Sequence, residues 1–115
     1  GRSMTFAGDM PEGHAARLMR TTNDSLIDSA ARASADALRS ATGRGDALVV
    51  SVSCVGRRLV LGERTEEEVE SVLEAAPAGT RHVGFYSYGE IAPGTAGAAS
   101  DLHNQTMTVT VFSER

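Results

Sequence analysis

Two short stretches in the last third of the chain hold most of the side chains that could do chemistry. They lie at 84–93, which reads GFYSYGEIAP, and at 102–106, which reads LHNQT. Because successive side chains of an extended strand point to opposite faces, Tyr86, Tyr88 and Glu90 are predicted to share one face. Phenol and carboxylate groups arranged in this way could orient a small polar ligand. The opposite face is predicted to join the core and carries three apolar side chains: Val83, Phe85 and Ile91.

The pair His103 and Asn104 and the carboxylate of Glu90 are each open to two interpretations. Asn104 could end the loop through hydrogen bonds to nearby backbone, with His103 as its neighbour, or both could contribute donors and acceptors to a ligand site. Glu90 follows a glycine within a predicted strand, where a bulge could aim it at the amino group of a ligand. It could equally form a buried structural ion pair with Arg57 or Arg58.

Cys54 and Arg57 lie three residues apart at the end of a β-branched stretch. A nearby guanidinium favours the thiolate form of a cysteine, and Cys54 with His103 as its base would resemble a thiol hydrolase. Asn104 or Glu90 would then orient the base. A lone cysteine after such a strand is more often a small buried hydrophobe, which is the interpretation we favour. Arg57 could hold a carboxylate in bidentate fashion, because the planar guanidinium matches the carboxylate plane.

Composition and charge exclude several classes of protein. The 115 residues fit one compact domain, 41% of them are hydrophobic, and no apolar run approaches the ~20 residues that cross a bilayer. The formal net charge is -4 and all 11 basic residues are scattered arginines, which argues against nucleic acid as a partner. The lack of lysine excludes Schiff-base lysine chemistry.

The cysteine and histidine content bears on location and cofactors. The single cysteine allows no intramolecular disulfide and the sequence shows no secretory signal, so we expect a cytoplasmic protein. The three histidines have no ligand spacing, so we expect neither a metal nor another cofactor. The chain begins with Gly1 in place of Met, from which we expect a domain cut from a longer polypeptide, with residues 1–3 derived from a vector.

The first third of the chain is predicted to form two strands and a helix. Residues 3–8 and 14–21 are typical of short strands joined by a turn that contains Pro and Gly. Between 23 and 42 the apolar positions recur at helical spacing, with Asn23 or Asp24 as the N-cap. Most of the buried stripe of this helix is alanine, which predicts close packing against its neighbours.

The middle of the chain is predicted to form a strand and two helical segments. Residues 46–53 are rich in valine and indicate a central strand. A short helical turn is predicted at 57–62. A longer helix is predicted to begin at a capping box at Thr65 and to end before Pro77.

The last third is predicted to form two strands, 81–91 and 105–112, joined by a mobile hairpin loop at 93–101. We expect these strands to pair antiparallel, and the strand-helix-strand unit before them to give a parallel pair. The predicted order β-β-α-β-α-β-β corresponds to a single α+β domain over residues 1–115. It would have two layers, with a mixed sheet of about five strands and two helices on one face.

Taken together, three blocks of the chain resemble the C-terminal domain of the FIST family. They are SCVGRR with LG nearby at 53–62, GFYSYGEIAP at 84–93 and LHNQT at 102–106. The segments TFAGDMPEG at 5–13 and RLMR at 17–20 resemble the start of that domain. The resemblance runs over nearly the whole chain, and the combination of the second and third blocks is its most specific part.

The resemblance implies an intracellular sensory module of signal-transduction proteins that binds a small ligand, and an amino acid is the ligand class we expect. The implied partners are an N-terminal FIST domain and signalling output domains. We also expect that the chain can form a homo-oligomer. The resemblance places candidate ligand-binding residues at the matching motif positions: Cys54, Arg57, Tyr86, Tyr88, Glu90, His103 and Asn104. It implies no catalytic residue.

The leading hypothesis from the sequence is therefore a ligand sensor. In this hypothesis Arg57 binds the ligand carboxylate, Glu90 binds its amino group, and binding shifts the population of the 93–101 loop. Two alternatives stay open: a cysteine-dependent hydrolase that uses Cys54 and His103, and a purely structural or interaction domain.

Overall fold

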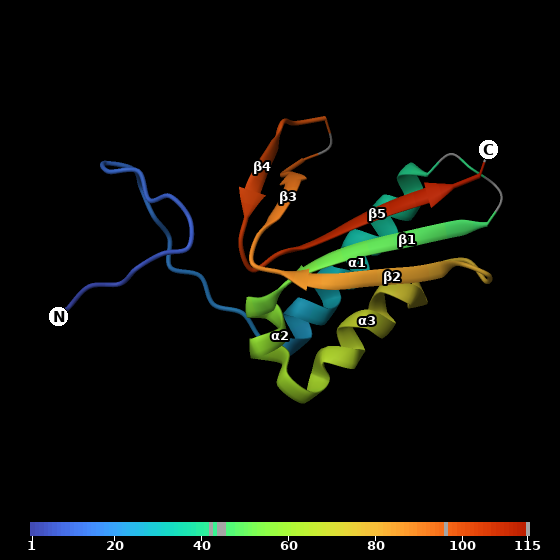
Figure 1. Cartoon of the computed structure of the whole chain (residues 1–115), viewed down its shortest axis with the longest axis horizontal. Helices are drawn as coiled ribbons and strands as arrows, with labels where there is room; N and C mark the ends of the chain where they lie inside the picture. The colour runs from blue at the N-terminus through green and yellow to red at the C-terminus, as the bar shows by residue number, and fades with distance from the viewer. Residues whose placement is uncertain (42, 44–45, 96, 115) are drawn as a thin grey trace.

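The computed structural model describes residues 1–41, 43, 46–95 and 97–114 of the chain. Its regular elements follow in chain order: α1 (Asn23–Ser40), β1 (Ala47–Cys54), α2 (Val55–Leu61), the 3-10 helix η1 (Gly62–Arg64), α3 (Thr65–Glu74), β2 (Arg81–Ser87), β3 (Glu90–Pro93), β4 (Ser100–His103) and β5 (Met107–Ser113). None of the helices in the described ranges is long and apolar enough to span a bilayer. The predicted α+β class is confirmed: helices cover one face of a mixed sheet, and a two-stranded sheet stands beside it (Figure 1).

β1 is the central strand of the main sheet, whose order is β2-β1-β5. It runs parallel to β2, with Val50 opposite Val83, and antiparallel to β5, with Val50 opposite Thr110. The predicted parallel pair is confirmed, and its crossover contains α2, η1 and α3. The predicted antiparallel pairing of 81–91 with 105–112 is wrong, because β1 lies between these strands and pairs with both.

The predicted strand 81–91 is divided by a turn after Ser87. Ser87 Oγ donates a hydrogen bond to Gly89 O at 2.7 Å, which stabilises the change of direction. The chain then enters β3, which pairs antiparallel with β4 so that Glu90 lies opposite His103. The predicted loop at 93–101 therefore contains the start of β4, and residue 96 within it lies outside the described residues.

The N-cap of α1 is Thr22, one residue before the predicted positions. Thr22 Oγ1 accepts a hydrogen bond from Ser25 N, and Ser25 Oγ accepts one from Thr22 N, both at 3.2 Å. The helix ends before residue 42, which was predicted as its last and lies outside the described residues. Its buried face carries small side chains, including Ala30 and Ser34, so it packs closely on α3 and β5.

The two helical segments in the middle of the chain form where the sequence predicts them. The turn predicted at 57–62 is confirmed by α2 and η1, and the longer helix by α3. The predicted capping box at Thr65 is wrong, because η1 leads into α3 without a break. Thr65 Oγ1 donates a hydrogen bond to Gly62 O at 2.6 Å and therefore does not cap the helix.

Residues 1–21 form no strand, so the two strands predicted at 3–8 and 14–21 are wrong. This segment is exposed throughout and extends away from the helices and the main sheet (Figure 1). A strand needs a neighbouring strand to bond its N–H and C=O groups. No described strand lies beside this segment, whose turn is closed by a single bond from His14 N to Pro11 O at 3.3 Å.

The helices pack on one face of the main sheet, where the buried side chains are mostly small. Val49, Ser51 and Ser53 of β1 point toward the helices and are buried. Val49 forms the core cluster with Ala30 of α1 and Val72 of α3. The buried layer is thin because serines and alanines supply much of it.

The opposite face of the main sheet, called the open face below, is mostly apolar and is not covered by the described residues. It consists of alternate residues of three strands: Leu48, Val50, Val52, Arg81, Val83, Phe85, Thr108, Thr110 and Phe112. Phe85 is 62% exposed and Val83 55%, whereas Tyr86 lies on the helix side, opposite the buried Ser53. The predicted face assignment is therefore wrong for β2, and Ile91, predicted to join the core, is also exposed.

Candidate functional site

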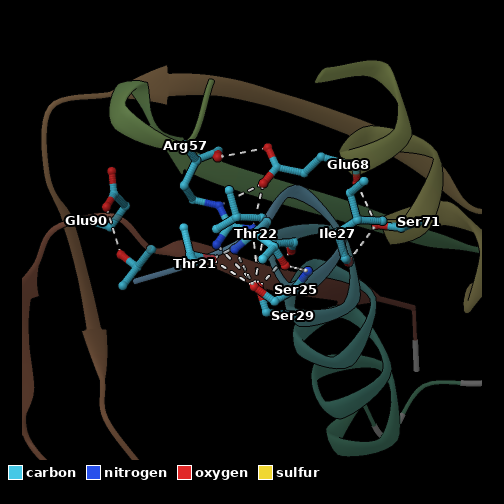
Figure 2. Close-up of polar contacts among 12 residues, drawn as sticks. Thr21, Thr22, Ser25, Ile27, Ser29, Arg57, Glu68, Ser71 and Glu90 are labelled. Carbon is cyan, nitrogen blue, oxygen red and sulfur yellow. Dashed lines mark hydrogen bonds and ion pairs between the residues drawn. The ribbon is translucent and has the colours of Figure 1, made fainter. Parts of the chain in front are cut away.

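Arg57 lies in the first turn of α2 and is buried in a polar cluster that joins all three helices. Its Nε donates a hydrogen bond to Glu68 Oε1 of α3 at 2.7 Å, and its Nη2 donates one to Leu26 O of α1 at 2.9 Å. Nη1 donates to Ser29 Oγ at 3.3 Å. Glu68 is fully buried, and its Oε2 accepts a hydrogen bond from Ser53 Oγ of β1 at 3.1 Å. Figure 2 shows Arg57 and Glu68 pointing toward one another above Ser29.

The predicted role of Arg57 changes in the light of this cluster. Sequence reasoning took its guanidinium as a carboxylate clamp, and the carboxylate that it clamps in the structure belongs to Glu68, at 2.6 Å from Nη2. Glu68 is not among the candidate residues that the sequence indicates. Nothing in the eleven-residue spacing reveals the pair, because α2, η1 and α3 must fold back before the two residues meet.

A cleft of about 550 Å³ borders the exposed side of this cluster. It is lined by residues 19–21 of the N-terminal segment, the first turns of α1, Arg57 and Val60 of α2, and Gln105. We call it the Arg57 cleft. Arg57 supplies a buried cationic group to it, and Ser25 and Ser29 supply hydroxyl groups.

Gln105 is a residue of the Arg57 cleft that sequence reasoning did not select. Its φ is 59°, a left-handed backbone conformation that few residues other than glycine adopt. Its side-chain amide lies against Gly56, where any Cβ would collide with it. The LHNQT block contains Gln105, so the available signal was its place in that block. Glycine at position 56 therefore makes room for the Gln105 amide beside Arg57.

Glu90 is buried at a different place, between the β2–β3 turn and the start of β5. It is 2% exposed, and its carboxylate accepts hydrogen bonds from Ser87 Oγ at 3.0 Å and from Thr106 Oγ1 at 2.7 Å. The structural ion pair with Arg57 or Arg58, one of the two interpretations above, is wrong. Figure 2 shows Glu90 to the left of Arg57, whereas Glu68 lies to the right of Arg57.

The remaining candidate residues do not gather around Arg57. His103 lies opposite Glu90 in the β3–β4 pair, and its Nε2 bonds to Ala92 O at 3.0 Å. Tyr88 is 88% exposed and Asn104 is also exposed. The structure thus brings Glu90 and His103 onto neighbouring strands and leaves the other two at the surface.

Cys54 is buried at the junction of β1 and α2, as the favoured interpretation predicted. It is 6% exposed and its backbone N–H donates a hydrogen bond to Thr106 O at 3.0 Å. Within the described part of the chain no hydrogen bond joins Cys54 to His103, the base of the hydrolase alternative. The sulfur therefore has the surroundings of a small packed side chain.

The model of the FIST C domain family matches residues 1–93 of the chain, which include the Arg57–Glu68 pair and end with β3. This chain belongs to the FIST C domain family. The match covers the motif blocks at 53–62 and 84–93 and leaves the LHNQT block at 102–106 outside it, and FIST C domains are sensory modules of signal-transduction proteins. The searches of curated proteins and of solved structures gave no match.

A second and smaller cleft of the FIST C domain lies beside β2, on the helix side of the sheet. It has a volume of about 230 Å³, and its polar side chains are those of Ser51, Ser53, His82 and Tyr86. Arg58 lies over the Tyr86 ring, with Cζ 5.2 Å from the centroid, as in a cation–π pair. Burial, followed by the negative charge of Glu68, raises the pKa of the Tyr86 phenol, so the phenol stays protonated at neutral pH.

His82 is fixed in this second cleft by a hydrogen bond of 2.7 Å between its Nε2 and Ser51 Oγ. Gly84 allows this contact, because a Cβ there would lie 2.5 Å from Ser51 Oγ. Sequence reasoning gave His82 no role. The contact depends on the β1–β2 register, which places Ser51 opposite Gly84, and no sequence motif marks it.

We expect burial of His82 to make the stability of the FIST C domain depend on pH. Burial lowers the pKa of His82 below its ordinary value of 6.5, so the unfolded chain takes up this proton more readily than the folded chain. The stability that comes from keeping His82 neutral in the folded state is fully present above pH 6.5. It is lost as the pH falls from 6.5 toward the lowered pKa that His82 has in the folded state. Urea midpoints measured between about pH 7 and pH 5 should fall less steeply in His82→Gln than in the wild type. His14→Gln, in the exposed N-terminal segment, is the control, and equal slopes in all three proteins would contradict the prediction.

Proposed function

We propose that this FIST C domain is a small-ligand-binding sensory module and that its ligand binds in the Arg57 cleft. The observation that carries the proposal is a cleft of about 550 Å³ with a buried guanidinium in its wall. This volume lies within the range of small-molecule sites, which combine mostly apolar walls with a few fixed polar groups. The buried Arg57 is held by Glu68, Leu26 and Ser29, so its orientation is set before a ligand arrives.

The charges around the cleft favour a ligand with a carboxylate, and an amino acid is the class we propose. Arg20 and Arg57 both line the cleft, and Glu68 neutralises only one positive charge. Nη1 of Arg57 has two N–H groups, and within the described residues its partner is Ser29 Oγ, which leaves a donor for the ligand carboxylate. Glu90 does not line this cleft, so the side-chain oxygens of Ser25 and Gln105 would accept from the ligand amino group instead.

Binding would be transmitted through the N-terminal segment, because residues 19–21 form one wall of the Arg57 cleft. A ligand that contacts this wall and α1 together stabilises the arrangement in which the segment is docked. The segment would pass this change to an N-terminal FIST domain and to signalling output domains, in a cytoplasmic signal-transduction protein. Residues 1–21 would therefore change their arrangement on ligand binding, in place of the 93–101 loop that the sequence suggested.

Isothermal titration calorimetry with the twenty common amino acids tests the proposal. We expect at least one to bind, and Gln105→Ala or Arg20→Ala to raise its Kd by at least about tenfold, because each removes a polar contact to a desolvated ligand. Arg32→Ala, an exposed arginine of α1 away from the cleft, is the matched control and should leave Kd unchanged. Absence of binding by every amino acid, or a Kd unaffected by the cleft substitutions, would contradict the proposal.

A further inference from the structure

The open face is an apolar surface that the described residues leave without a covering layer. Phe85 and Phe112 are 62% and 58% exposed at its two ends, and Val50 and Val52 lie half-buried at its centre. Monomeric proteins seldom expose contiguous apolar patches beyond a few hundred Å², and the two phenylalanines alone contribute roughly 200 Å². The composition of this face is that of an interface between packed sheets and not of a solvated surface.

The register of the sheet makes this face complementary to itself. At one level of the sheet Val52 of β1 lies between Phe85 of β2 and Thr108 of β5. At another level Leu48 lies between Arg81 of β2 and Phe112 of β5. The first level thus has a large and a small side chain on its two edge strands, and the second has an arginine and a phenylalanine.

We propose that the open face is the interface of a homodimer, with a two-fold axis parallel to the strands. This axis places β2 of each copy over β5 of the other and β1 over β1. Phe85 then packs over the small Thr108 of the second copy, and Val83 over its Thr110. The same operation repeats both contacts on the other side of the axis, as an isologous interface requires.

Charged residues at one end of the open face also bear on how a second copy of the chain fits it. Arg81 begins β2, while Asp46 and Glu114 lie at the same end of β1 and β5, joined by a backbone hydrogen bond of 3.4 Å. All three are exposed. The two-fold axis places Arg81 of each copy over Phe112 of the other, one step along the strand from Glu114, so the long arginine side chain can cover the ring and reach that carboxylate. The axis also brings the Asp46 residues of the two copies together, so the two Arg81–Glu114 contacts must outweigh the repulsion between these carboxylates.

The size of the open face sets the expected affinity. Three strands spaced about 4.8 Å apart give a narrow face, so each copy buries less than the roughly 800 Å² of a standard interface. We therefore expect a dimer with a dissociation constant in the micromolar range.

Sedimentation equilibrium of the 115-residue chain, from about 1 to about 100 µM, tests the dimer. We expect the average mass to rise from one chain toward two over this range. Phe85→Ser should raise the dimer Kd by at least about tenfold, because it removes one of the two aromatic anchors of the face. Leu59→Ser is the matched control: Leu59 is 78% exposed on α2, outside the open face, and its loss should leave Kd unchanged.

A charge exchange tests the proposed axis. Arg81→Glu should weaken the dimer, and adding Glu114→Arg in the same chain should recover affinity. Circular dichroism verifies that each variant is folded. A chain that stays monomeric at every concentration would overturn the proposal. A dimer unaffected by Phe85→Ser would overturn it as well, and failure of the charge exchange to recover affinity would overturn the two-fold arrangement.

Discussion

Replacing Glu68 with alanine should lower the free energy of unfolding of this FIST C domain by about 3–5 kcal/mol. Glu68 is fully buried, and its oxygens bond to Arg57 and to Ser53. Its loss leaves the guanidinium of Arg57 in the interior without a counter-charge. A desolvated, unpaired charge destabilises the folded state more than the lost contacts themselves do. Urea denaturation followed by circular dichroism measures the change.

Two further variants separate the buried charge from other causes. Glu67, the neighbouring residue on α3, bonds to Arg64 at 2.8 Å on the protein surface, where water and salt screen the pair, so Glu67→Ala should hardly move the urea midpoint. The double variant Arg57→Met with Glu68→Leu removes both buried charges and should recover most of the stability that Glu68→Ala loses. A Glu68→Ala protein as stable as Glu67→Ala would contradict this account of the core.

Replacing Val72 with alanine should lower the free energy of unfolding by about 2 kcal/mol. Val72 is fully buried in the cluster with Ala30 and Val49, where α3, α1 and β1 meet. Its closest polar neighbour, Ser34, is fixed by a hydrogen bond of 2.6 Å from its Oγ to Val72 O. Because the surrounding side chains are small and fixed, they cannot move in to fill the cavity. The free energy is measured by urea denaturation, with an unchanged m-value as the sign that the denatured state is not altered.

Val69 provides the matched control on the same helix. It is 39% exposed, so Val69→Ala removes the same atoms from a site that is partly in water, and the expected loss is below about 0.5 kcal/mol. Equal losses at the two positions would contradict the packing account, because alanine has the higher helix propensity of the two residues and its propensity cannot cause a loss. A loss at Val72 that is much smaller than expected would mean that the core can rearrange around the cavity.

These predictions follow from one property of the fold, which is a thin core that combines few large apolar side chains with a buried ion pair. Serines 34, 51, 53 and 71 are all buried and hydrogen-bonded. The larger apolar side chains of β2 instead lie on the open face. A second layer over that face would therefore stabilise the domain further, which links the stability of the single chain to the proposed dimer.

The elements that the sequence predicts well are those with a strong local pattern. α1 and α3 have apolar side chains at helical spacing, and β1 has a run of valines, so each forms within a few residues of its predicted limits. The two predicted N-terminal strands flank a clear turn that contains Pro and Gly, but neither strand forms. Their backbone groups need a neighbouring strand, and the described residues supply none beside them.

The candidate site could be predicted only in part. Arg57 was selected as a candidate and lies in the wall of the Arg57 cleft, but its pairing with Glu68 was not predicted. Glu90 was also selected. Its hydrogen-bond partners are the hydroxyl groups of Ser87 and Thr106, and not the arginine of one of the two interpretations. Gln105 was missed, because its importance depends on a backbone conformation and on its contact with Gly56.

By itself, the sequence determined the α+β class, the positions of the main helices and of β1, and the membership of the FIST C domain family. These follow from side-chain periodicity and motifs, which depend on residues close together in the chain. Only the tertiary structure decided that β1 lies between β2 and β5, that Phe85 faces outward, and that Arg57 meets Glu68. Each of these depends on which distant surfaces pack together. Here α1 contributes the small side chains of Ala30 and Ser34 to the core, β1 contributes two buried serines, and the phenylalanines Phe85 and Phe112 lie on the other face of the sheet.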